Sequence, residues 1–340
     1  MQLATLIRQF LEYIEVERGR SKRTIENYQF YLGRFLDWAG QHGMNGPAGI
    51  TQDRVREYRL WLNRFKDRAG GELKKNTQNY HLIALRAFLK YLAKRDIKTL
   101  APEKIELGKQ SMRQVDFLEA EDLERMLRAP LEIKNVKLTI KNGVDIVTLR
   151  DKAILEMLFS TGLRVSELAA LKRTTVNPKK DEFTVRGKGS KPRVVFMSPE
   201  AREWLKKYLD ARGDMSDFLF VRHDRAVSHP VILSAAKNPV HKRTGSLAHA
   251  RDDHKGNLTP RSIQRIVAKY ARAAGITKRI TPHTLRHTFA TDLLRNGADI
   301  RSVQALLGHS SITTTQVYTH ITDTQLREVH KAFHARRRND

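Results

Sequence analysis

Apolar residues recur every three or four positions along almost the whole of this 340-residue chain. That spacing gathers them on one face of an α-helix, so it predicts a mainly helical protein whose helices each bury one side. The period changes to two only between Glu182 and Phe196, where two runs rich in β-branched and aromatic residues flank the glycine-rich segment 187–191. Such an arrangement predicts a β-hairpin. The expected fold class is therefore mainly α with a small antiparallel β-sheet.

The length of the chain favours two domains, because a single hydrophobic core seldom serves so many residues. Residues 1–97 contain four amphipathic helical patterns separated by glycines. Residues 98–115 lose the helical period and contain proline and glycine, so we expect an interdomain linker there. Residues 116–340 form the expected second domain.

Within the second domain, two stretches interrupt the helical pattern. The first, about 131–148, follows a short helix that we expect to end before Pro130. The second, 222–257, is basic and contains five histidines at spacings that fit no standard metal-ligand pattern. We interpret it as a flexible insertion that contacts nucleic acid rather than as a metal site. A last helical pattern, 322–336, has an apolar side that needs a partner.

The charge of the chain indicates its partner. Lys and Arg number 63 against 37 Asp and Glu, for a formal net charge of +26. So large an excess predicts a polyanionic partner, and nucleic acid is the leading candidate. The alternative is an ordinary enzyme that happens to be basic. The polar faces of the first four helices carry cations that can neutralise phosphates: Arg8, Arg18, Arg20, Lys22, Arg23, Lys74, Lys75, Arg86 and Lys90.

The absence of cysteine excludes disulfides, cysteine-based zinc sites and thiol nucleophiles, and it favours a reducing cytoplasm. The first twenty residues mix charges into every turn and lack the apolar core of a signal peptide. No uncharged apolar run approaches the length of a membrane span. We expect a cytoplasmic protein with no membrane association.

Two pairs of residues suggest an anion-binding site. His283 and Arg286 stand three positions apart, which places an imidazole and a guanidinium on one helix face. Arg164 and Glu167 have the same spacing. An exposed Arg–Glu pair is usually a weak surface ion pair. Here apolar neighbours flank the pair, and a guanidinium in such a setting is costly unless it binds an anion.

Three further residues complete a set suited to a phosphodiester. Two arginines can hold the non-bridging oxygens and stabilise the charge of a pentavalent transition state, and His283 and His309 can add hydrogen bonds. Tyr318 can attack phosphorus, and Lys188, between two glycines of the hairpin turn, can protonate the leaving oxygen. This scheme requires neither a metal ion nor another cofactor.

These motifs, in this order, resemble those of the tyrosine recombinase (phage integrase) family, particularly its Xer-like site-specific recombinases. Residues 161–168 resemble the motif of the first catalytic arginine, with Arg164 as that arginine and Glu167 as its supporting residue. The other matches are the lysine hairpin at Lys188, the His-x-x-Arg helix at His283 and Arg286, the second histidine at His309 and the nucleophile at Tyr318. Each motif alone can arise by chance, but five in order hardly can.

The resemblance implies an N-terminal helical, SAM-like core-binding domain followed by an α+β catalytic domain, which together clamp double-stranded DNA. It implies strand cleavage through a 3'-phosphotyrosyl bond, in a homo-tetramer or a hetero-tetramer with a second recombinase on two DNA sites. The helix at 322–336 would dock on a neighbouring protomer. The biological outcome would be chromosome dimer resolution or integration of a mobile element.

Two alternatives remain at this point. A type IB topoisomerase-like enzyme uses similar chemistry as a monomer, and a DNA-binding protein can retain a relic of the site. The segments 131–148 and 222–257 are longer than in compact Xer-like proteins, which bears on substrate choice rather than on the chemistry.

Overall fold

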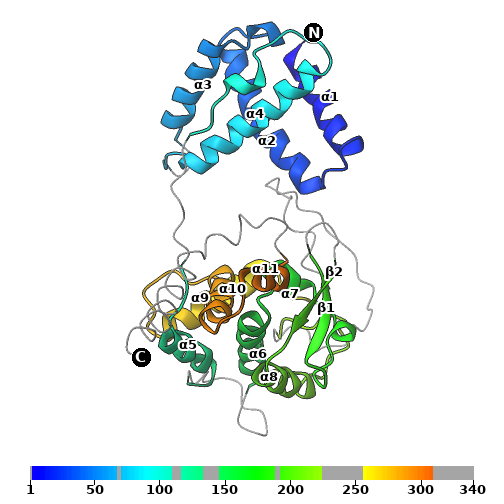
Figure 1. Ribbon diagram of the computed structural model, residues 1–340, viewed down its shortest axis with the longest axis vertical. Helices are drawn as coiled ribbons and strands as arrows, with labels where there is room; N and C mark the ends of the chain where they lie inside the picture. The colour runs from blue at the N-terminus through cyan, green and yellow to red at the C-terminus, as the bar shows by residue number, and fades with distance from the viewer. Residues whose placement is uncertain are drawn as a thin grey trace, which may run out of the picture. The chain divides into compact units, whose positions relative to one another are not determined.

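The chain folds into two compact units, Met1–Met112 and Arg113–Asp340 (Figure 1). The structure is a computed structural model that describes residues 2–66, 70–108, 116–132, 145–187, 192–223 and 256–308. The segment at 222–257 and the one at 131–148 therefore lie largely outside the described residues, and the helix expected at 322–336 lies entirely outside them.

The N-terminal unit is helical, as the apolar period predicts. Its elements are α1 (Leu3–Val16), α2 (Lys22–Gln41), η1 (Pro47–Gly49), α3 (Gln52–Arg64), α4 (Lys75–Ala93) and η2 (Pro102–Lys104). Ser21 and Thr51 begin α2 and α3 by accepting hydrogen bonds from backbone N–H groups of the first turn, which are otherwise unpaired. The apolar faces of the four α-helices meet in a single core that contains Phe10, Phe35 and Phe88.

A buried polar cluster lies inside this core. The Tyr58 hydroxyl is 3.3 Å from His81 Nδ1, and Arg34 Nη1 is 3.4 Å from His81 Nε2. Burial, together with the charge of Arg34, lowers the pKa of His81 to about 4. His81 is therefore neutral at physiological pH and can accept the hydrogen bond from Arg34 while it links α2, α3 and α4.

The segment after α4 packs against the same core. Ile105 is buried there, and Asn79 exchanges two hydrogen bonds with the backbone of Gly108, at 2.9 and 3.0 Å. The packing of the N-terminal unit therefore continues through residue 108.

The C-terminal unit contains the remaining helices and the sheet. Its elements are α5 (Ala120–Glu132), α6 (Ile146–Thr161), α7 (Val165–Ala170), η3 (Arg173–Thr175), β1 (Glu182–Arg186), β2 (Pro192–Phe196), α8 (Pro199–Asp210), α9 (Pro260–Ala273), α10 (Pro282–Arg295) and α11 (Ile300–Leu307). Helix α6 is central, since its side chains are buried nearly all round and it packs on α5, α8 and α10. The expectation that the helix near residue 121 ends before Pro130 is wrong, because Pro130 lies inside α5 and is buried.

A buried ionic cluster joins α6 to α9. The Asp151 carboxylate accepts hydrogen bonds from the side chain of the adjacent Arg150, at 2.7 and 2.9 Å, and from the Tyr270 hydroxyl at 3.0 Å. Arg150 also donates to the carbonyl of Val221. These bonds satisfy charges that would otherwise be costly to bury.

The predicted hairpin is present. Strands β1 and β2 pair antiparallel, with Glu182 opposite Phe196 and Arg186 opposite Pro192. Among the described residues this is the only sheet, so the predicted fold class is confirmed. Val221 and Asn257, which are described residues before and after the gap at 224–255, form an antiparallel bridge.

Candidate active site

The first part of the site is the turn between α6 and α7. Helix α6 ends at Thr161, and Gly162 adopts a left-handed conformation with φ 57°. A side chain is disfavoured there both by the backbone and by space, since a Cβ would lie 2.5 Å from the Phe289 ring. The turn directs Arg164 to the start of α7, where Glu167 Oε2 accepts the N–H of Arg164 at 2.9 Å. The predicted proximity of Arg164 and Glu167 is confirmed: Arg164 Nη1 lies 2.9 Å from Glu167 Oε1.

A second arginine holds the same carboxylate. Arg193, on β2, donates from Nη1 to Glu167 Oε1 at 2.9 Å and from Nη2 to Oε2 at 2.8 Å. Burial alone raises the pKa of the Glu167 carboxyl, but the hydrogen bonds from Arg193 and from the Arg164 backbone, with the nearby positive charges, hold it at about 2. Glu167 is therefore an anion at any physiological pH.

Arg286 forms the second cationic part of the site. It lies on α10, where Thr281 caps the N-terminus and Pro282 occupies the first turn. Its side chain is 2% exposed. Arg286 Nη1 donates to the carbonyl of Gly162, and Nη2 donates to the carbonyl of Leu307. Arg286 therefore joins α10 to the turn before Arg164 and to the end of α11.

His283 lies one turn before Arg286 on the same helix. It is exposed, and its ring packs edge-on against His287 with 4.2 Å between ring centroids. The imidazole is thus on the surface while the guanidinium is buried.

These parts converge on the end of α11. Arg164 Nη2 donates to the carbonyl of Gly308 at 3.1 Å, and Arg286 donates to the carbonyl of Leu307 one residue earlier. Gly308 has φ 62° and ends the helix, and a Cβ there would lie 2.9 Å from Arg193 Cδ. The fold thus brings together two arginines that are 122 positions apart in the sequence. The next residue is His309, another predicted site residue.

Three of the predicted site residues, Lys188, His309 and Tyr318, lie outside the described residues. The strands on either side of Lys188 form the hairpin, and α11 ends at Leu307, two residues before His309. Their roles remain predictions.

Sequence reasoning missed Arg193. The available signal was its place in the second strand of the hairpin, two residues beyond Lys191. Along that strand, more buried and more exposed positions alternate. Nothing in that pattern reveals a partner 26 positions away in sequence, so its pairing with Glu167 becomes visible only in the folded chain.

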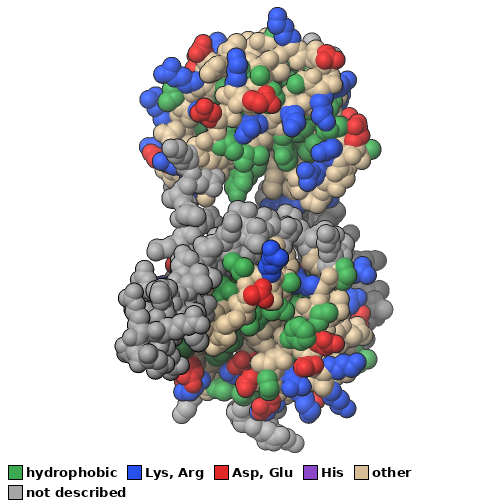
Figure 2. Space-filling view, viewed as in Figure 1, with side chains coloured by type: hydrophobic (Ala, Val, Ile, Leu, Met, Phe, Trp, Pro, Cys, Tyr) green, Lys and Arg blue, Asp and Glu red, His purple; other side chains and the backbone are tan. Residues whose placement is uncertain are grey.

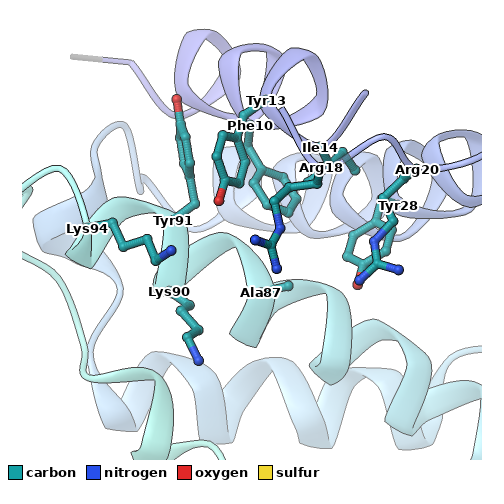
Figure 3. Close-up of a pocket in the computed structure, with 10 residues that line it drawn as sticks. All are labelled: Phe10, Tyr13, Ile14, Arg18, Arg20, Tyr28, Ala87, Lys90, Tyr91 and Lys94. Carbon is teal, nitrogen blue, oxygen red and sulfur yellow. The ribbon is translucent and has the colours of Figure 1, made fainter. Parts of the chain in front are cut away.

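A separate basic surface lies on the N-terminal unit. Figure 2 shows Lys and Arg side chains spread over the visible face of this unit. Four of the unit's cations line a hollow of about 180 Å³ between α1, α2 and α4, together with aromatic rings (Figure 3). The cations of this α1–α4 basic pocket are Arg18, Arg20, Lys90 and Lys94, and its aromatic residues are Phe10, Tyr13, Tyr28 and Tyr91.

No carboxylate lines the pocket, and none of its four cations forms an ion pair within the described part of the chain. In Figure 3 Arg18 extends from the end of α1 toward α4. Because a liquid water occupies about 30 Å³, the hollow has room for a phosphate-sized anion. Three of the four cations are among those predicted to neutralise phosphates; Lys94 was not.

Two further properties concern metals and membranes. Across the described ranges, no group of three or more His, Asp or Glu side chains is arranged to hold a metal ion. In the same ranges no helix is both long and apolar enough to span a membrane.

Comparison with known proteins identifies the family. Residues 116–325 match the Phage integrase family, and residues 7–96 match the family's N-terminal SAM-like domain. The chain belongs to the phage integrase family. The predicted resemblance to the family is confirmed, and so is its division into a SAM-like domain and a catalytic domain.

Similar proteins within the family are named tyrosine recombinase XerD. The protein of Chlorobaculum tepidum is 36% identical over 330 residues, which cover 96% of this chain and 95% of that protein. The protein of Oceanobacillus iheyensis is 33% identical over 334 residues, covering 97% of this chain and 98% of that protein.

Solved structures with the same fold include two complexes with DNA sites. The XerH site-specific recombinase bound to a palindromic difH substrate aligns with a TM-score of 0.65 and 21% identity, over 95% of this chain and 83% of that chain. A lambda integrase dimer bound to a COC' core site aligns with a TM-score of 0.62 and 16% identity, over 92% of this chain and 97% of that chain. At these identities the likeness concerns the fold.

Proposed function

We propose that this protein is a tyrosine-type site-specific DNA recombinase, which cuts and rejoins duplex DNA through a 3'-phosphotyrosyl intermediate. Membership of the phage integrase family and near full-length similarity to proteins named tyrosine recombinase XerD support this function. The names of these relatives support a Xer-like role. The outcome that we propose for it is chromosome dimer resolution or integration of a mobile element.

One structural observation carries the proposal. Arg164 and Arg286, from helices far apart in sequence, bind consecutive backbone carbonyls at the end of α11, directly before His309. Two guanidinium groups held by neighbouring carbonyls gather positive charge beside His309, which suits a phosphodiester whose negative charge grows in the transition state.

The proposed reaction uses six side chains. Tyr318 attacks phosphorus with its phenolic oxygen, giving up its proton to solvent water as the phosphotyrosyl bond forms. The bond from phosphorus to the 5' oxygen breaks, and Lys188 supplies the proton that makes this oxygen a hydroxyl. Arg164 and Arg286 bind the phosphate oxygens, with hydrogen bonds added by His283 and His309. A 5'-hydroxyl from the partner duplex then reverses the step, so no nucleotide cofactor is consumed.

The first domain, about residues 1–97, is assigned to DNA binding, residues 98–115 to the linker, and 116–340 to catalysis. The first part of this linker, through Gly108, still packs against the N-terminal unit. Double-stranded DNA is the proposed partner, and the α1–α4 basic pocket is a candidate contact with its backbone. Unpaired cations suit this task, because each one that neutralises a phosphate releases a counterion.

The proposed assembly is a tetramer on two DNA sites, either of identical chains or with a second recombinase. Contact between protomers is assigned to the helix predicted at 322–336, and contact with DNA to the segment 222–257. The proposed compartment is the cytoplasm, since the substrate is cellular DNA.

Covalent capture tests the function directly. The protein is incubated in a chelator with a pool of randomised duplexes that carry a nick, and denaturing electrophoresis then detects protein joined to DNA. The expected result is an adduct with the wild-type chain and none with Tyr318→Phe. Absence of adduct from the wild-type chain across pools with different nick positions contradicts the catalytic function.

A further inference from the structure

We infer that Arg193 is a positioning residue, which compensates the charge of Glu167 so that Arg164 presents a net positive charge to the scissile phosphate. This inference rests on the proposed function, because it assigns a role within the same site.

The hydrogen bonds show which arginine holds the carboxylate more fully. Arg193 donates to both oxygens of Glu167, from two different nitrogens, at 2.9 and 2.8 Å. The side chain of Arg164 donates to one oxygen only, and its second terminal nitrogen is used on the carbonyl of Gly308. A two-point guanidinium–carboxylate pair is the stronger geometry, so Arg193 is the principal partner of Glu167.

Burial separates the two arginines in the same way. The side chains of Arg193 and Glu167 are each 9% exposed, whereas that of Arg164 is 32% exposed. Arg193 and Glu167 therefore form the inner pair, and Arg164 is the member that an anion from solvent can reach.

The charges of the three residues sum to one positive charge. Without Arg193, the charges of the Glu167 carboxylate and Arg164 would sum to zero. Of the two arginines, only Arg164 would then remain in contact with the buried carboxylate. Its guanidinium would then be drawn onto Glu167 and would have less charge to offer a phosphate.

A purely stabilising role explains the arrangement less well. Arg193 Nε is buried and has no hydrogen-bond partner among the residues described. The Arg193 side chain also lies against Gly308, and a Cβ at that position would be 2.9 Å from Arg193 Cδ. Arg193 thus contacts both Glu167, which is the partner of Arg164, and Gly308, which precedes His309.

A double-mutant cycle separates charge compensation from simple support. The variants are Arg193→Met, which removes the charge but keeps a long side chain, Glu167→Gln, and the two together. We measure the rate of covalent adduct formation on a nicked duplex and, separately, the affinity for an intact duplex.

Arg193→Met is expected to slow adduct formation by about 100-fold, the typical loss when one charge-stabilising group fails, while affinity for DNA changes only a few-fold. Adding Glu167→Gln restores the single positive charge, so the double variant should react at least about tenfold faster than Arg193→Met. A double variant that reacts no faster than Arg193→Met overturns the inference, as does an Arg193→Met protein that reacts like wild type.

If Arg193→Met fails to fold, Arg193→Lys decides. Lysine keeps the positive charge, so adduct formation within about tenfold of wild type is expected, and a loss of about 100-fold or more in a folded Arg193→Lys protein overturns the inference. The wild-type reaction distinguishes this failure from failure of the proposed function, since the latter leaves no adduct in any variant.

Discussion

Replacement of Gly162 by alanine should weaken the C-terminal unit at the point where the two arginines meet. Gly162 has φ 57°, and a Cβ there would lie 2.5 and 2.8 Å from two atoms of the Phe289 ring and 3.2 Å from Leu307 Cδ2. The left-handed conformation costs a residue with a side chain about 1–2 kcal/mol. Overpacking of a filled site costs about 1–3 kcal/mol more. The free energy of opening around α6 and α10 should therefore fall by about 2–5 kcal/mol.

Hydrogen exchange measured by mass spectrometry reports this loss by region. Since about 1.4 kcal/mol corresponds to a tenfold change, exchange in peptides from α6 and α10 should speed up by about 30-fold to several thousand-fold, whereas peptides from α2 should not change. Adduct formation should also fall, because the carbonyl of Gly162 accepts a hydrogen bond from Arg286.

Two other glycines serve as matched controls. Gly297 has φ 93° but no atom within 4 Å of its would-be Cβ, so Gly297→Ala should show only the conformational cost of about 1–2 kcal/mol. Gly213 has neither constraint, and Gly213→Ala should be nearly neutral. If Gly162→Ala lowers the free energy of opening no more than Gly297→Ala does, the side chains around Gly162 are not packed as closely as the distances imply, and the reasoning is refuted.

Three further outcomes are expected. The double variant Arg18→Ala, Lys90→Ala should reduce the slope of log affinity for DNA against log salt concentration by about 1.8, because about 0.9 is lost for each phosphate contact. The control variant Lys206→Ala, Lys207→Ala removes two cations that pair with acidic residues on α8, and it should leave this slope unchanged. The N-terminal unit should lose stability as pH falls from 6.5 toward 4, because His81 binds a proton in the unfolded chain at these pH values but not in the folded chain. Hydrogen exchange in α4 peptides should report this loss, and an equally steep loss in His81→Gln would contradict the reasoning. Arg286→Ala should abolish adduct formation yet retain affinity for duplex DNA, and a variant that loses only affinity would contradict the role assigned to Arg286.

Sequence reasoning predicted the helices well where local signals agree. Helix α11, Ile300–Leu307, shows how such signals set the bounds of a helix, because Asp299 caps its start and Gly308 ends it in a left-handed conformation. Pro130 shows the limit of such signals. A proline normally marks a helix boundary, but here it is buried in the last turn of α5, where packing against the core offsets its local cost.

The candidate site was predictable in its parts and not in its connections. The three-residue spacing of Arg164 and Glu167 predicted their contact, because residues three positions apart at the start of a helix are neighbours. The place of Arg193 depends on the register of the hairpin against α7, which is a long-range property. The convergence of Arg164 and Arg286 on the end of α11 likewise requires the packed fold.

The most direct test of the account is to identify the residue that becomes joined to DNA. Adduct from the wild-type chain is digested with protease and nuclease, and the nucleotide-bearing peptide is sequenced by mass spectrometry. The account predicts a single modified residue, Tyr318, linked through its phenolic oxygen to a 3'-phosphate. Attachment at any other residue, or through a 5'-phosphate, would contradict it.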